Sequence, residues 1–166
     1  MHALDKMSVG TMTLQRFNGD EVFSVAEATV DFYIEVDQTF ATTFRAVAAT
    51  PPMKTLPDTE ELHAKPFAEL MLYLSKHPGI ALLTGRSCTL AEGYDQASGE
   101  HLTNFYYGEH ELVDDVEIAV LKRDGERAHL RLTGTTVDVN HYDGSKPKTK
   151  ILIDAEFTLK FVRRNA

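Results

Sequence analysis

Strict alternation of apolar and polar residues over 150–161 most constrains how this chain can fold. The apolar residues at every second position are Ile151, Ile153, Ala155, Phe157, Leu159 and Phe161. Because successive side chains of a strand point to opposite faces, this spacing gathers the apolar set on one face and the charged residues and threonine on the other. Leu152 is the exception on the polar face. The pattern predicts an antiparallel strand with one buried face and one face in water.

A second region of alternation lies near the start of the chain and contains a turn signal. Asn18-Gly19 is the dipeptide most typical of a two-residue hairpin turn, and it would pair Leu14 with Phe23. The alternation then continues through residues 28–46 and predicts two further strands. We therefore expect the first third of the chain to be antiparallel β-structure.

Another hairpin is predicted within residues 116–132 by matching apolar side chains across the two strands. A three-residue loop at 123–125 would pair Val120 with Ala128 and keep the apolar residues of both strands on one face. A two-residue loop at 124–125 would instead set apolar residues beside polar ones on the same face of the sheet. The favoured loop requires Gly125 to adopt a positive φ, which glycine does without steric cost.

One main helix is predicted over about 66–77. Pro66 suits the first helical turn, the tripeptide at 77–79 is a stop signal, and Asp58 with Glu61 predicts a lead-in helical turn. The apolar residues that recur at helical spacing are Phe67, Leu70, Met71 and Leu74.

The expected architecture combines these elements in a single domain, residues 1–166. Two weaker strands, 80–94 and 101–107, flank a turn-prone segment and complete the pattern. The fold class is mainly β (α+β): a curved antiparallel sheet, barrel-like or sandwich-like, with the helix packed on it. At this length a single core can bury about 70% of the surface that the unfolded chain exposes.

The charge balance excludes some function classes. The chain has 17 Lys and Arg against 25 Asp and Glu, a net charge of −8, which argues against nucleic-acid and anionic-membrane binding. No apolar run reaches the length of a membrane helix, and the first ten residues lack the apolar stretch of a signal peptide. The lone Cys88 cannot form an internal disulfide. We therefore expect a soluble protein of a reducing, cytoplasmic compartment.

No residue pattern indicates a metal site, a cofactor or a nucleophile. The segment 138–144 is rich in oxygen ligands but departs from the calcium-loop template, because Tyr142 stands where a ligand belongs. Cys88 has no neighbouring basic group or helix start that would activate it. The candidate binding residues are three histidines in polar surroundings and one arginine that faces outward beside a histidine: His110, His129, Arg131 and His141.

At the level of fold alone, a helix followed by long antiparallel strands is compatible with the hotdog arrangement, in which a sheet wraps one helix. The extra strands before Pro51 fit that arrangement poorly. If it held, dimers would bind acyl thioesters between subunits, and the acid–base candidates would be the polar residues around the helix: Glu69, His63 and His77.

Two function classes follow from these observations, and a third, metal binding at the acidic segments, ranks below both. The first is a non-enzymatic β module that binds a small molecule or a protein, forms a homodimer, and binds neither nucleic acid nor membrane. The alternative is a hotdog-like thioesterase or dehydratase that uses carboxylate and histidine. A deep apolar pocket beside the helix, with a histidine or glutamate at its mouth, would favour the enzyme.

Overall fold

The computed structural model describes residues 8–34, 40–64, 68–75 and 87–163, and in these ranges the chain is mainly β. Ten strands form one sheet in the order β5-β10-β11-β12-β1-β2-β3-β4-β8-β9. These strands are β1 (Gly10–Arg16), β2 (Gly19–Ile34), β3 (Phe40–Ala48), β4 (Ala68–Ser75), β5 (Cys88–Leu90), β8 (Thr103–Tyr107), β9 (Glu109–Glu111), β10 (Asp114–Asp124), β11 (Arg127–Thr136) and β12 (Thr149–Arg163). The other elements are the hairpin of β6 (Tyr94–Asp95) and β7 (Glu100–His101), and the 3-10 helix η1 (Pro57–Ala64).

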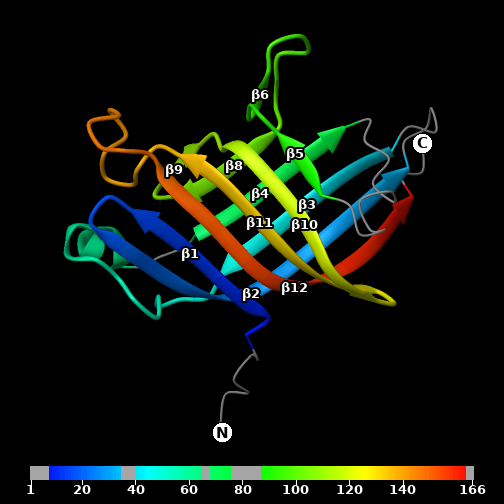
Figure 1. Cartoon of the computed structure of the whole chain (residues 1–166), viewed down its shortest axis with the longest axis horizontal. Helices are drawn as coiled ribbons and strands as arrows, with labels where there is room; N and C mark the ends of the chain where they lie inside the picture. The colour runs from blue at the N-terminus through cyan, green and yellow to red at the C-terminus, as the bar shows by residue number, and fades with distance from the viewer. Residues whose placement is uncertain (1–7, 35–39, 65–67, 76–86, 164–166) are drawn as a thin grey trace, which may run out of the picture.

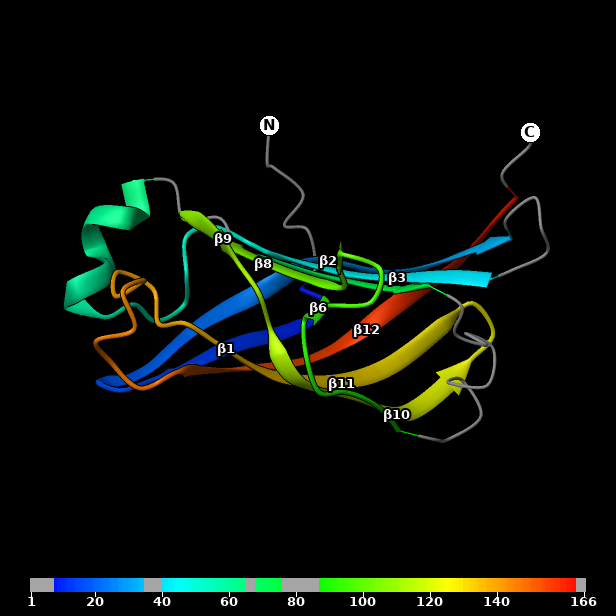
Figure 2. The same ribbon diagram turned by 90° about the horizontal axis from the view of Figure 1, so that it is seen from above.

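The sheet curls into a half-barrel, with β3, β8 and β9 in one layer and β10, β11 and β12 in the other (Figure 1, Figure 2). The layers meet beside Gly10, the first residue of β1. β12 pairs with β1 up to Gly10, and beyond this point Leu159 pairs in parallel with Val30 of β2. A Cβ at Gly10 would lie 2.2 Å from the carbonyl oxygen of Asp154, so this close crossing requires glycine.

The predicted strand at 150–161 is present and supplies much of the core. Its inward side chains are almost fully buried from Ile151 to Leu159, as the alternation requires. Each fully buried aliphatic or aromatic side chain contributes about 1.5–3 kcal/mol. Phe161 is 61% exposed, because it lies at the open end of the half-barrel, where it stacks on Phe32 with ring centroids 5.0 Å apart.

The first predicted hairpin forms, but its register differs from the prediction by two residues. Leu14 pairs with Glu21 instead of Phe23, because the turn lies at residues 17–18 and not at 18–19. Side chains alternate with a period of two, so a shift of two residues leaves each of them on its predicted face. Leu14 and Phe23 are accordingly both fully buried.

The second predicted hairpin differs in the same way. Val120 pairs with Leu130 instead of Ala128, around a two-residue turn at 125–126. The prediction of the loop was therefore wrong, although Val120 and Ala128 lie on their predicted face. The predicted positive φ at Gly125 is confirmed, since its φ is 57°.

The helix predicted over 66–77 is wrong. Residues 68–75 form the strand β4, which is hydrogen-bonded to β3 on one side and β8 on the other. Ala68, Leu70 and Leu72 are buried, so the segment follows a period of two. The segment contains an alternating apolar series as well as the helical one. The strands on both of its edges favour the alternating series, because strand propensity depends strongly on neighbours.

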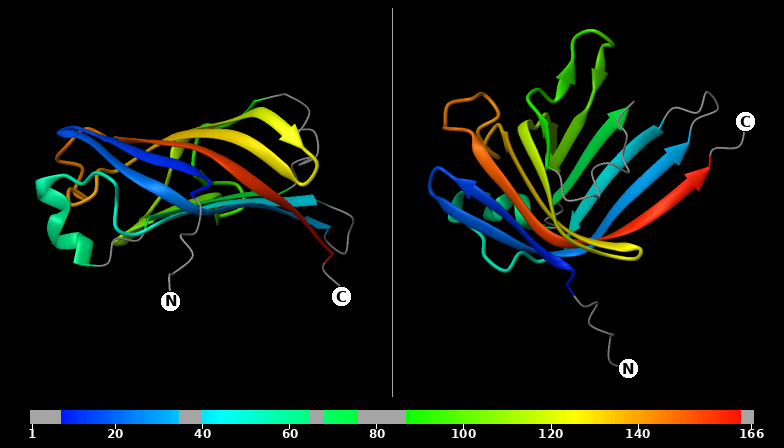
Figure 3. Two further views of the ribbon diagram at one scale, coloured as in Figure 1. Left: turned by 90° about the horizontal axis from the view of Figure 1, so that it is seen from below. Right: turned by 45° about the vertical axis from the view of Figure 1, so that its right-hand side comes forward.

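Helical structure in the described residues is limited to η1, which contains the predicted lead-in turn from Asp58. Across the same ranges, no helix has the length and apolar character needed to span a bilayer. The predicted turn between the weaker strands is present as the β6–β7 hairpin, which projects away from the sheet (Figure 3).

Candidate functional site

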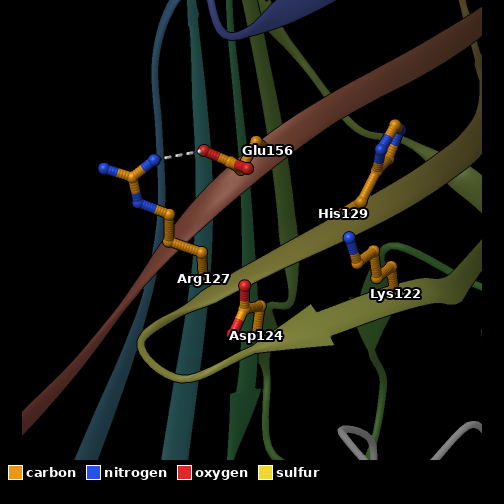
Figure 4. A pocket seen from close by; sticks show the side chains of 5 residues that line it. All are labelled: Lys122, Asp124, Arg127, His129 and Glu156. Carbon is orange, nitrogen blue, oxygen red and sulfur yellow. Dashed lines mark hydrogen bonds and ion pairs between the residues drawn. The ribbon is translucent and has the colours of Figure 1, made fainter.

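A groove on the outer face of β10, β11 and β12 is the candidate functional site (Figure 4). It encloses about 250 Å³ and is lined by Lys122, Asp124, Arg127, His129 and Glu156. A second pocket of about 480 Å³ shares Arg127 and Glu156 and extends to Ser8, Val9 and Thr158. The two pockets adjoin at these shared residues, and the second lies beside the start of the described chain.

Strand register places the five lining side chains in two neighbouring rows. Lys122 pairs with His129, and His129 pairs with Glu156, so these three lie side by side across three strands. Asp124 pairs with Arg127 in the next row. Directly paired residues have Cβ atoms about 4.5–5.5 Å apart, which lets one small ligand contact several of them at once.

A β-bulge places Lys122 and Asp124 on this face. The pairing of β10 with β11 shifts between Val120 and Lys122. If Leu121 were paired in a regular ladder, the period of two would point Lys122 to the same side as Val120, toward the core. The shift instead leaves Leu121 48% exposed and turns Lys122 and Asp124 outward. Bulges often redirect side chains beside functional sites in this way.

His129 is held by a carboxylate. Its Nε2 contacts Asp154 Oδ1, and the other Asp154 oxygen accepts hydrogen bonds from Arg131 Nε at 3.1 Å and Nη2 at 2.9 Å. The hydrogen bond from His129, followed by that from Arg131, lowers the pKa of Asp154 despite its partial burial. The sequence prediction thus named two residues that the structure brings together. No described residue bonds His129 Nδ1, which leaves that nitrogen for a ligand.

The groove also contains charged groups without a partner elsewhere in the described ranges. Lys122 and Asp124 form no ion pair or hydrogen bond there with another side chain. Arg127 donates from Nη1 to Glu156 Oε1 at 3.0 Å, and its remaining guanidinium N–H groups bond no described side chain. The site can therefore offer an anion an ammonium group and part of a guanidinium.

The predicted residue His110 lies far from this groove in the sheet order, on β9. Its Nδ1 is 3.0 Å from Asn104 Oδ1, and its ring lies 4.8 Å from that of Tyr106. His110 therefore belongs to the outer face of the opposite layer.

The predicted residue His141 lies at the other end of the half-barrel, in the loop between β11 and β12. Its Nδ1 is 3.1 Å from Asp138 Oδ1, and Asp138, Asp58 and His141 are close enough to suggest a metal site. However, Arg16 lies between the carboxylates: its Nη2 is 2.7 Å from an oxygen of each. This fixed cation already supplies the positive charge, so the donor set does not suit a metal ion.

The acid–base candidates fall into two groups. Glu69 lies on the outer face of β4 and is bound by Arg45 Nε, so its carboxylate is already paired. The side chain of His63 and the whole of His77 lie outside the described residues. The helix that was expected to gather these three is a strand in its described part.

Sequence reasoning missed Lys122, Asp124, Arg127 and Glu156 as site residues. Arg127 and Glu156 carried a weak signal, because both fall on the polar side of well-patterned strands. Lys122 and Asp124 carried none, since their outward direction depends on the bulge. Comparison of the chain with family models, with curated proteins and with solved structures finds no match.

Proposed function

We propose that this protein is a non-enzymatic binding module whose groove on β10, β11 and β12 takes a small ligand with an acidic group. The observation that carries the proposal is the pairing of Lys122 with His129 in one row of the groove, each with a nitrogen that bonds no described residue. Arg127 borders the same pocket from the next row. The Lys122 ammonium and the remaining guanidinium N–H groups of Arg127, which border one depression, suit a carboxylate or a phosphate.

The carboxylates of the groove restrict which anions fit. Glu156 is balanced by Arg127, but Asp124 adds an unpaired negative charge on the same lining. A highly charged anion would be repelled by Asp124, whereas a ligand that also carries an amino group would be attracted by it. A small zwitterion, with its acidic end at Lys122 and its amino end at Asp124, therefore matches the groove best.

Isothermal titration calorimetry tests this proposal with taurine as the zwitterion, inorganic phosphate as the anion and choline as the cation. We expect taurine to bind, phosphate to bind more weakly than taurine, and choline not to bind. Lys122→Gln should weaken the binding by about tenfold, because it removes one charge-assisted hydrogen bond. Lys148→Gln is the matched control, since Lys148 is an exposed lysine that pairs with Asp114 outside the groove.

Asp124→Asn separates the two ligand classes. It should weaken taurine and leave phosphate unchanged or tighter. Absence of binding by both probes, or an equal loss in Lys148→Gln and Lys122→Gln, would overturn the proposal.

The enzymatic alternative has less support. A hotdog-like enzyme needs a central helix, and no α-helix occurs in the described ranges. Its acid–base candidate Glu69 is paired with Arg45 on an outer face. Hydrolysis of an acyl-thioester panel, lost in Glu69→Ala, would restore that alternative.

A further inference from the structure

The two ring nitrogens of His129 have different roles in the groove, because one of them is fixed by a carboxylate. Its Nε2 contacts Asp154 Oδ1, and hydrogen bonds from His129 and Arg131 lower the pKa of the Asp154 carboxyl, which is therefore ionised at neutral pH. A carboxylate accepts hydrogen bonds and does not donate them, so Nε2 carries the hydrogen of the neutral ring. Nδ1 then presents a lone pair, which bonds no residue in the described ranges.

The charged side chains around this ring come from all three strands of the groove. Arg131 Nη2 is 2.9 Å from Asp154 Oδ2, and this arginine is thereby paired. Arg127 Nη1 is likewise 3.0 Å from Glu156 Oε1. Lys122, by contrast, lies directly opposite the ring in the strand register (Figure 4) and has no ion pair within the described chain. The charged neighbours of the ring are Lys122 and Asp124 of β10, Arg127 and Arg131 of β11, and Asp154 and Glu156 of β12.

A proton on Nδ1 changes what the ring offers to a ligand. In the neutral ring, the lone pair of Nδ1 repels the negative oxygen of an acidic group that Lys122 holds. In the protonated ring, Nδ1 offers an N–H donor and a positive charge beside the Lys122 ammonium, while Nε2 keeps its contact with Asp154. Histidine is the side chain whose charge ordinarily changes between about pH 5 and pH 8. The affinity for an acidic group should therefore depend on pH in this range.

We infer that the groove binds its acidic ligand together with a proton, which His129 takes up at Nδ1. The inference rests on the proposed function and states how that site is regulated. The proton comes from the solvent and returns to it when the ligand leaves, so no covalent bond to the ligand is involved. Because linkage is reciprocal, the proton and the ligand strengthen the binding of each other by the same factor.

Isothermal titration calorimetry with taurine at about pH 7.5 and about pH 5.5 tests the inference. Taurine keeps both its sulfonate and its ammonium charged across this range, so a change in affinity arises from the protein. We expect the dissociation constant to be about tenfold lower at the lower pH, which corresponds to one added charge-assisted hydrogen bond. At the higher pH, titrations in buffers that differ in enthalpy of ionisation should show a net uptake of protons on binding.

His129→Gln separates the titration of the ring from its contact with Asp154. A glutamine amide can still donate to Asp154 but does not gain a proton in this range. We expect this variant to bind taurine within about twofold of the parent protein at the higher pH, and to lose the pH dependence and the proton uptake. His110→Gln is the matched control and should keep both, because His110 is an exposed histidine on β9, outside the groove.

An affinity for taurine that is equal at the two pH values, or weaker at the lower one, would overturn the inference and leave the proposed function standing. A pH dependence that His129→Gln retains, or that His110→Gln loses to the same extent, would overturn it as well. Absence of taurine binding at both pH values would overturn the proposed function and this inference with it. Circular dichroism at both pH values verifies that each protein remains folded.

Discussion

Two charged clusters of this molecule contain the same kinds of residue in opposite surroundings. In the first, Arg16 and Asp138 have fully buried side chains, and Asp58 completes the cluster with a side chain that is 28% exposed. In the second, the groove cluster, the side chain of Arg127 is 68% exposed and that of Glu156 is 50% exposed. We call the first the buried cluster.

The difference distinguishes charges that stabilise the fold from charges that remain available to bind a ligand. In the buried cluster, Arg16 donates to both carboxylates and to the Val139 carbonyl oxygen, and Thr149 donates to Asp138. These bonds connect the β1–β2 hairpin, η1 and the β11–β12 loop. In the groove cluster, water competes for every charge, so the ion pairs add little stability and can exchange for a ligand.

The electrostatics of the buried cluster agree with this role. Burial alone would raise the pKa of the Asp138 carboxyl, but hydrogen bonds from Arg16 and Thr149 outweigh it and lower the pKa. Burial would likewise lower the pKa of the Arg16 guanidinium, and its bonds to Asp138 and Asp58 raise it instead. Both partners therefore keep their charges in the folded protein.

Removing one carboxylate from each cluster should give the largest contrast. Asp138→Ala leaves Arg16 buried with one of its two carboxylate partners. We therefore expect a loss of about 3–5 kcal/mol in the free energy of unfolding. Glu156→Ala, in the groove cluster, should cost about 1 kcal/mol or less. Urea denaturation at neutral pH measures both values. Equal losses would show that burial does not separate the clusters.

Lowering the pH should remove the contribution of the buried cluster to the free energy of unfolding. The folded-state pKa values of Asp138 and Asp58 lie below their ordinary 3.8, so the unfolded chain takes up protons first. The stability that they add is therefore present above about pH 4 and is lost as the pH falls through the folded pKa values. We expect the difference in unfolding free energy between the parent protein and Asp138→Ala to shrink below about pH 4. A difference that stays constant down to about pH 2 would contradict this assignment.

The hairpin that carries the groove should depend on backbone geometry more than on charge. Gly125 has a φ of 57°, and a Cβ there would meet no atom within 4 Å. Gly125→Val should therefore cost about 1–2 kcal/mol through backbone strain alone. Gly125→Asn is the control and should cost less, because asparagine tolerates the left-handed region. A thermal melt without loss in the valine variant would refute the explanation.

The smallest effect is expected for the ion pair between Arg127 and Glu156. A double-mutant cycle with Arg127→Gln and Glu156→Gln should give a coupling energy of about 0.2–1 kcal/mol, which falls further in about 0.5 M salt. A coupling that persists in high salt would mean that the groove is shielded from water, and the comparison between the clusters would need revision.

The faces of the strands could be predicted from the sequence, and the registers could not. Leu14 and Phe23 point into the core as the alternation requires, but they do not pair with each other. A register shifted by two residues buries the same side chains, so the hydrophobic pattern cannot tell the two apart. The geometry of the turn decides, and Asn18 occupies the turn in either register.

The helix prediction failed because the two periods overlap in one short segment. Leu70 lies in the helical series with Met71, and also in the alternating series with Leu72. The strands on either side of β4, which bury one face and supply backbone partners, are distant in sequence. Only the assembled sheet contains that information.

One of the five residues that line the candidate site could be predicted from the sequence. His129 faces outward as expected and is held with Arg131 by Asp154. Lys122 could not be found, because its direction depends on an irregularity in strand pairing that composition does not reveal.

The bulge at Leu121 also affects how such a groove can change during evolution. Deleting this single residue would restore a regular ladder in which Lys122 still pairs with His129 and Asp124 with Arg127. Lys122 would then directly follow the inward-facing Val120, so it would keep its outward direction. Chains descended from a common ancestor could therefore gain or lose this one codon and retain the recognition surface.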